Sequence, residues 1–228
     1  MGKYLNPGNE AFRISVQDDI YIDKSGLISF VNNRIGKRKR YICVSRPRRF
    51  GKSMAAEMLS AYYDSSCDSK ELFCHLAIAE DVSYKQHLNQ YKTLFLNIQH
   101  FLRKAETPEN LTNYIEARVL AELKMEYKEW IEETETSLPE ALASVFEKEQ
   151  GCKKGFIFII DEWDCIFREA KGNKEAHKSY LDFLKDLFKD RTYVKAAYMT
   201  GILQILCGKP TPLGVGWIAR LFYNYLCM

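Results

Sequence analysis

An unbroken run of apolar residues, 156–160 (FIFII), constrains the fold of this chain more than any other segment. A strand with one face in water alternates apolar and polar residues, and this run has no such alternation. Both faces of the strand must therefore be covered. Parallel sheets with helices on both faces are the usual way to cover such a strand, so the run predicts a buried strand in an α/β fold.

Strand-like and helix-like segments alternate along the rest of the chain. Further strands are expected at residues 41–45, 94–98 and 194–199. Apolar residues at helical spacing predict helices near residues 25–36, 52–63, 108–133, 139–151 and 177–189. Residues 1–20 contain Pro7 and Gly8 and are expected to be irregular. The alternation predicts a three-layer α/β/α sandwich with a mainly parallel sheet.

The composition excludes several classes of protein. The chain has 228 residues, 46% hydrophobic and 28% charged, which is ordinary for one globular domain with a short appendage. Its net charge of +3 is too small to indicate nucleic-acid binding by itself. The seven cysteines include no CxxC pair, which favours reduced thiols. No apolar run approaches the roughly 20 residues of a membrane span, so a cytoplasmic protein without a membrane partner is expected.

A glycine–lysine–serine sequence lies between the expected strand at residues 41–45 and the expected helix at 52–63. The loop and the start of the helix consist of Arg46, Pro47, Arg48, Arg49, Phe50, Gly51, Lys52 and Ser53. The Walker A pattern, G-x-x-x-x-G-K-[ST], binds nucleotide phosphates in this strand–loop–helix setting. Gly51 would let the main chain approach the phosphates. Lys52 would contact the β- and γ-phosphates, and Ser53 would ligate Mg²⁺.

Arg46 departs from the Walker A pattern, because it stands at the position of the first glycine. Arg46, Arg48 and Arg49 could bind phosphate oxygens through their guanidinium groups. The alternative is a basic turn in water, followed by a helix that begins at a glycine.

An acidic pair, Asp161 and Glu162, follows the apolar run directly. Ligands of α/β sheets bind beyond the carboxyl ends of the strands, so both carboxylates are expected at the nucleotide. Asp161 would hold Mg²⁺, and Glu162 would act as general base on the attacking water. The alternative is that Asp161 caps the next turn and Glu162 is merely exposed. Asp164 is expected to cap a helix beginning at Cys165, and the alternative is that it supports the metal shell.

A polar residue also ends the expected strand at residues 194–199. Some NTPases have an additional strand between the Walker A strand and the Walker B strand. A polar residue at the end of that strand reaches the γ-phosphate or the lytic water. Thr200 would have this catalytic role, and the alternative is a simple turn formed with Gly201.

Several segments together resemble the AAA-ATPase-like domain of bacterial proteins. They are residues 21–25 (YIDKS), 45–53 (SRPRRFGKS), 159–164 (IIDEWD), 181–188 (LDFLKDLF) and 200–205 (TGILQI). SRPRRFGKS is the most specific of them, and the resemblance spans roughly residues 8–205. It implies a P-loop NTPase fold of the additional-strand, catalytic-glutamate type. Lys52, Ser53, Asp161 and Glu162 match the Walker positions of the family, and an arginine at position 46 is normal there.

The resemblance also suggests a division of the chain. Residues 1–205 are expected to form the AAA-ATPase-like P-loop domain, and residues 206–228 a divergent tail. Residues 217–228 are expected to form a short packing helix, unless the gene product is truncated. Longer members of the family often continue into a nuclease-like domain of the PD-(D/E)XK kind.

These motifs favour an ATP-binding protein, and a Mg²⁺-dependent ATPase whose coupled task is unknown. Adenine is expected near residues 21–24 and the helix that follows. A nucleotide-binding switch or truncated remnant without hydrolysis is one alternative. A nucleic-acid-associated module that uses the basic segment 37–49 is another. Self-association is left open.

Overall fold

A single parallel sheet forms the centre of the molecule. The computed structural model describes residues 2–149, 154–203 and 224–225. Within them the strand order is β2-β3-β4-β1-β5, and every neighbouring pair is parallel. The strands are β1 (Tyr41–Ser45), β2 (Lys92–Asn97), β3 (Phe156–Asp161), β4 (Val194–Gly201) and β5 (Asn224–Tyr225).

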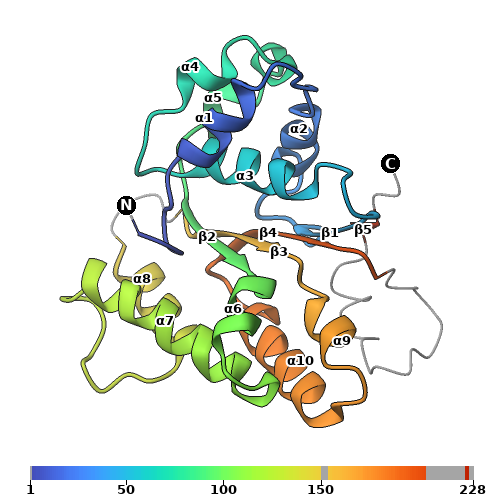
Figure 1. Ribbon diagram of the computed structural model, residues 1–228. Coiled ribbons are helices and arrows are strands. Elements are labelled where there is room, and N and C mark those ends of the chain that lie inside the picture. The colour runs from blue at the N-terminus through green and yellow to red at the C-terminus, as the bar shows by residue number, and fades with distance from the viewer. Residues whose placement is uncertain (1, 150–153, 204–223, 226–228) are drawn as a thin grey trace.

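Helices lie on both faces of the sheet, which confirms the expected three-layer sandwich (Figure 1). One face carries α1 (Glu10–Val16), α2 (Gly26–Asn32), α3 (Lys52–Tyr63), α4 (Lys70–Phe73) and α5 (Tyr84–His87), with a 3-10 turn at Ala77–Glu80. The other face carries α6 (Ile98–Lys104), α7 (Leu111–Glu126), α8 (Leu138–Lys148), α9 (Cys165–Glu169) and α10 (Lys174–Phe188). Each face has its own cluster of buried apolar side chains.

Strand β3 is buried along its whole length, as its sequence predicts. Phe156, Phe158 and Ile160 pack into the cluster under α6–α10. Ile157 and Ile159 pack into the cluster under α1–α3. Burying a side chain of this size contributes about 1.5–3 kcal/mol, so the strand requires both helical layers.

Strand β4 lies between β1, which precedes the expected P-loop, and β3, which ends at Asp161. Tyr198 is aligned with Ile42 of β1 on one side and with Ile159 of β3 on the other. This is the additional strand that the family resemblance implies. Because all three strands run in parallel, their carboxyl ends meet at one edge, with Ser45 aligned with Gly201.

The helix expected at residues 108–133 covers fewer residues in the structure than the spacing of apolar residues predicts. Pro108–Asn110 form a 3-10 turn, and α7 ends at Glu126. Tyr127 leaves the helix with φ −120° and ψ 42°. Its ring stacks on Trp130 at 5.4 Å, and both pack on the core from a loop. The apolar spacing therefore continues beyond the helix, because the loop after it is also partly buried.

The expectation that residues 1–20 are irregular is wrong at Glu10–Val16, which form α1. Phe12 anchors this helix, since it is fully buried and stacks on Phe73 at 5.0 Å. A helix of seven residues with one buried side chain shows no apolar period in the sequence.

The expected tail at residues 206–228 is described only at Asn224 and Tyr225. These two residues form β5 beside β1 rather than part of a helix. The rest of that expected helix, and the boundary near residue 205, lie outside the described residues. In the part of the chain that is described, no helix is both long enough and apolar enough to cross a membrane.

Candidate functional site

The loop at residues 46–51 connects β1 to α3 at the carboxyl edge of the sheet. Gly51 begins the helix with φ +71°, in the left-handed region that glycine adopts without strain. A Cβ atom at Gly51 would also collide with Nζ of Lys24. That ammonium donates to the carbonyl of Phe50 at 2.9 Å. Gly51 is therefore favoured by the turn, whereas the flexible side chain of Lys24 could move away from a Cβ atom.

Lys52 points back into its own loop. Its Nζ donates to the carbonyl oxygens of Arg46 at 3.0 Å and Pro47 at 2.9 Å. Only 7% of the residue is exposed. Water has little access to this ammonium, so the two carbonyl oxygens provide the hydrogen-bond partners that a buried charge requires.

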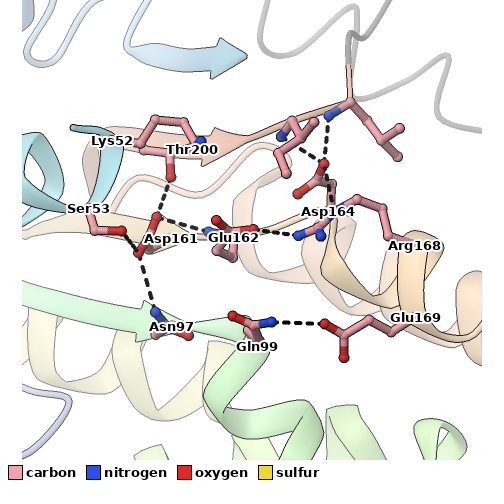
Figure 2. A network of polar contacts seen from close by, with 12 residues as sticks. Lys52, Ser53, Asn97, Gln99, Asp161, Glu162, Asp164, Arg168, Glu169 and Thr200 are labelled. Carbon is pink, nitrogen blue, oxygen red and sulfur yellow. Dashed lines mark hydrogen bonds and ion pairs between the residues drawn. The ribbon is translucent and has the colours of Figure 1, made fainter. Parts of the chain in front are cut away.

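Asp161 is the centre of the polar network at this edge (Figure 2). Its Oδ2 accepts hydrogen bonds from Oγ of Ser53 at 2.8 Å and Nδ2 of Asn97 at 3.3 Å. Its Oδ1 accepts from the hydroxyl of Thr200 and from the N–H of Glu162. Asp161 is 1% exposed and Thr200 is fully buried. Residues from β2, β3, β4 and α3 thus converge on one carboxylate.

The oxygens of Ser53 and Asp161 suit a small hard cation. Adjacent ligands of an octahedral Mg²⁺ lie about 3.0 Å apart, given metal–oxygen distances of roughly 2.1 Å. Oγ of Ser53 and Oδ2 of Asp161 are 2.8 Å apart. No group of three or more His, Cys, Asp or Glu side chains that could hold a metal occurs among the described residues. Mg²⁺ needs no such group, because it keeps several waters and phosphate oxygens as ligands.

Glu162 lies at the wall of an open cavity of about 490 Å³ in front of the loop at residues 46–51, the predicted phosphate loop. Its backbone has φ +53°, which is uncommon for a residue with a side chain. Its carboxylate forms an ion pair with Arg168 of α9. The lining residues of this cavity are Arg48, Arg49, Gly51, Lys52, Ser53, Met54, Gln99, Arg103 and Glu162. Cations therefore dominate the cavity, which favours an anionic ligand.

A second cavity, of about 630 Å³, lies against the same loop and shares Gly51 and Lys52 with the first. Its walls are mainly apolar and include Leu27, Phe30 and Tyr198. Burial raises the pKa of Tyr198 above its ordinary value, so the phenol is neutral. A cationic cavity and an apolar cavity thus meet at the glycine and lysine of the loop.

Asp23 supplies a carboxylate to the lining of the apolar cavity. Burial acts to raise the pKa of this carboxyl group, but hydrogen bonds from the N–H groups of Ala77 and Ser25 lower it overall. The two bonds measure 2.8 Å and 2.7 Å. Asp23 is therefore ionised and held in place beside the apolar walls.

The sequence-predicted residues divide into groups in the structure. Ser53 and Thr200 each donate a hydrogen bond to Asp161. Lys52 and Glu162 line the cationic cavity beside them. The other residues of the loop occupy different places: Arg48 and Arg49 line the cationic cavity, Arg46 and Phe50 line the apolar cavity, and Pro47 contributes its carbonyl to Lys52. Phe50 is 56% exposed.

The expectation that Asp164 caps α9 is wrong. Asp164 stands at the N-cap position, but its side chain makes no capping hydrogen bond. Its Oδ2 accepts instead from the N–H groups of Ile202 at 2.8 Å and Leu203 at 2.6 Å. The sequence cannot show this contact, because the residues are far apart in the chain and meet only through the order of the strands.

Sequence reasoning missed several residues at the site. Asn97 ends β2, which lies beside β3. Thr200 is singled out as a polar residue at the end of a strand, and the same reasoning would identify Asn97 once the strand order is known. Gln99 and Arg103 reach the cationic cavity from α6, and Lys24 reaches the loop from the turn before α2. Arg168 is the ion-pair partner of Glu162. No local pattern marks Gln99, Arg103 and Arg168. Lys24 lies in the segment 21–25 (YIDKS), whose resemblance to the family is the one available signal.

The basic run at residues 37–40 does not join the phosphate loop in one surface. It precedes the first residue of β1, whereas the loop follows the last, so the two segments lie at opposite ends of the strand. Arg40 donates from Nη2 to the carbonyl of Arg191 at 3.3 Å and lies over the ring of Tyr41.

Comparison with known proteins agrees with this geometry. Residues 8–208 match a family described as predicted AAA-ATPase. No curated protein and no solved structure was found to match the chain. The matched segment contains the sheet from β1 to β4, the phosphate loop and the acidic strand end. The chain therefore belongs to the AAA-ATPase-like family, whose description implies nucleotide binding.

Proposed function

We propose that this protein binds ATP together with Mg²⁺ and hydrolyses it to ADP and phosphate. The observation that carries the proposal is the convergence of Ser53 and Thr200 on the buried carboxylate of Asp161, beside a cavity lined by cations. Each of three segments supplies one side chain to this centre: the expected P-loop supplies Ser53, the end of β3 supplies Asp161, and the end of β4 supplies Thr200. In a basic turn without a ligand, nothing requires these three elements to meet.

The phosphate loop would bind the triphosphate through its main chain and Lys52. N–H groups at the start of α3 are free of partners within the helix, and the helix dipole favours an anion there. The ammonium of Lys52 would exchange the carbonyls of Arg46 and Pro47 for phosphate oxygens. Arg48, Arg49 and Arg103 add positive charge to the walls of the same cavity.

Ser53 and Asp161 would hold Mg²⁺ through oxygens that are already adjacent. The ion, when bound, supplies positive charge to the β- and γ-phosphate oxygens. Asn97 and Thr200 orient the Asp161 carboxylate from the two neighbouring strands. A carboxylate held from both sides keeps its direction without reorganisation, which is the property that electrostatic catalysis requires.

Glu162 would act as general base. The oxygen of a water forms a bond to the γ-phosphorus, and one water proton passes to the Glu162 carboxylate. The bond from the γ-phosphorus to the bridging oxygen breaks, and its electron pair stays on ADP. The position of Glu162 supports this proposal, because the residue follows Asp161 directly and lines the cationic cavity.

The apolar cavity would receive the adenine base. Leu27, Phe30 and Tyr198 offer apolar and aromatic contacts to a flat ring. The ionised carboxylate of Asp23 lies in the same lining and could accept a hydrogen bond from the exocyclic amino group. The two cavities meet at Gly51 and Lys52, as base and phosphates of one nucleotide require.

Calorimetric titration of ATP tests the proposal. The wild type should bind ATP more tightly with Mg²⁺ than without it. Lys52→Ala should weaken binding by about tenfold or more, equivalent to roughly 1.4 kcal/mol. Lys178→Ala is a matched control, because Lys178 is exposed on α10 at the far face of the sheet. Equal affinity of the wild type and Lys52→Ala, or no binding by either, would refute the proposal.

A further inference from the structure

The side chain of Glu162 is held by a contact that belongs to neither Walker motif. One carboxylate oxygen, Oε2, pairs with Nη2 of Arg168. The two side chains are only 16% and 17% exposed, so water screens this pair less than a surface ion pair. Arg168 lies on α9, the short helix that follows the acidic strand (Figure 2).

Arg168 is itself anchored. Its Nε lies 3.5 Å from Oδ2 of Asp164, which is fully buried. The same Oδ2 accepts from the N–H groups of Ile202 and Leu203, directly after β4. The contact between Arg168 and Asp164 is an ion pair without a hydrogen bond from Nε. Because the guanidinium group is planar and rigid, charge attraction at one edge also favours one direction of its other nitrogens. The backbone directly after β4 thus helps to orient Arg168 through Asp164.

The segment between Asp161 and Asp164 is tied to β4 at a second point. The N–H of Trp163 donates to the carbonyl of Thr200 at 3.0 Å. Gly201 packs against the indole ring of Trp163 so closely that a Cβ atom there would lie 2.8 Å from Asp164. The left-handed backbone of Glu162 is held between these fixed neighbours.

We infer that Arg168 is a positioning residue for Glu162: it binds Oε2 and thereby leaves Oε1 directed to the water that attacks the γ-phosphate. The inference rests on the proposed hydrolysis. The inferred role of α9 is to position the Glu162 carboxylate, a role that no residue of the Walker motifs has. A glutamate at φ +53° without this contact could turn its carboxylate away from the cavity.

Steady-state ATP turnover and calorimetric ATP binding together test the inference. Arg168→Met should lower kcat about 10- to 100-fold, because small misplacements of a reacting group have effects of this size. The Kd for ATP should stay within about threefold of the wild type, since Arg168 acts on the transition state rather than on binding. Arg168→Lys should recover part of kcat because it keeps a cation beside Glu162. Arg191→Met is the control: Arg191 forms a more exposed ion pair with Glu140 at 3.1 Å outside the site.

A double-mutant cycle separates positioning from a structural role. In the background of Glu162→Gln, Arg168→Met should cause no more than about a twofold further loss of kcat, because its target is already removed. The inference is overturned if Arg168→Met turns over ATP like the wild type or faster. It is also overturned if the loss is equally large in both backgrounds. Should Arg168→Met fail to fold, the same cycle with Arg168→Lys decides.

The outcomes also separate this inference from the proposed function. A wild type that hydrolyses ATP, beside an Arg168→Met variant of equal kcat, removes only the role of Arg168. A wild type that binds ATP without hydrolysing it removes both Glu162 as base and Arg168 as its positioning residue. A wild type that binds no ATP removes the proposed function entirely.

Discussion

Replacing Thr200 by valine removes one hydrogen bond from Asp161 and changes the shape of the side chain little. Thr200 is fully buried, so the valine is not exposed to water. A hydrogen bond to a charged group contributes about 1.5–3 kcal/mol to stability. In the variant, Oδ1 of Asp161 still accepts a hydrogen bond from the N–H of Glu162 at 3.1 Å. The expected loss in the free energy of unfolding therefore lies toward the lower end of this range, at about 2 kcal/mol. For a chain of this length that loss lowers Tm by about 4–8 °C.

Urea denaturation measures the loss directly. The midpoint of Thr200→Val should fall while the slope of the free energy of unfolding against urea stays unchanged. Thr112→Val is a matched control, because the Thr112 hydroxyl bonds the neutral hydroxyl of Ser179 at 3.1 Å, away from the site. The control should lose less stability and keep its ATP turnover, whereas Thr200→Val should lose most of its turnover. The reasoning is refuted if Thr200→Val is as stable as the control variant or hydrolyses ATP as fast as the wild type.

Three further predictions concern the metal, the cationic cavity and pH. Ser53→Ala should bind ATP without Mg²⁺ as well as the wild type does, but should lose most of the gain in affinity that Mg²⁺ gives, measured by calorimetry; an undiminished gain would contradict the role of Ser53. Arg103→Ala should weaken ATP binding severalfold, and the difference from the wild type should shrink at high salt, because Arg103 is exposed at the cavity wall. Burial lowers the pKa of His87 below 6.5, so the unfolded chain binds the proton more tightly and the free energy of unfolding falls as pH drops below about 6.5. His87→Gln should lose this component in urea unfolding at pH 5 and 7, and an unchanged pH dependence would exclude it.

The buried strand and its acidic end could be predicted from sequence because each depends on local chemistry. An apolar run without alternation has one stable environment, between two helical layers. The loop ending in Gly51, Lys52 and Ser53 is likewise defined by adjacent residues. The parallel alternation then places strand ends together, which is why Ser53, Asp161 and Thr200 were expected at one edge.

Contacts between segments distant in sequence could not be predicted in the same way. Asn97 reaches Asp161 only because β2 lies beside β3, and strand order is not written in any single segment. Asp164 stands at a helix start, where capping is the usual role, but the backbone after β4 supplies the donors that its side chain accepts from. Arg168 looks like any charged residue of a helix until α9 turns it toward Glu162.

The contacts of Lys52 also bear on the energetics and the speed of ligand capture. Its ammonium, 7% exposed, is already bound to two carbonyls of its own loop. In the proposed mode of binding, an incoming phosphate would replace these partners, and the net enthalpy gained would be smaller than a count of new contacts suggests. The same two bonds hold the loop in shape, so the proposed association would cost little further conformational entropy. At this lysine, the proposed binding would exchange two carbonyl oxygens for phosphate oxygens. Its rate would then depend on how fast the carbonyls of Arg46 and Pro47 release the ammonium.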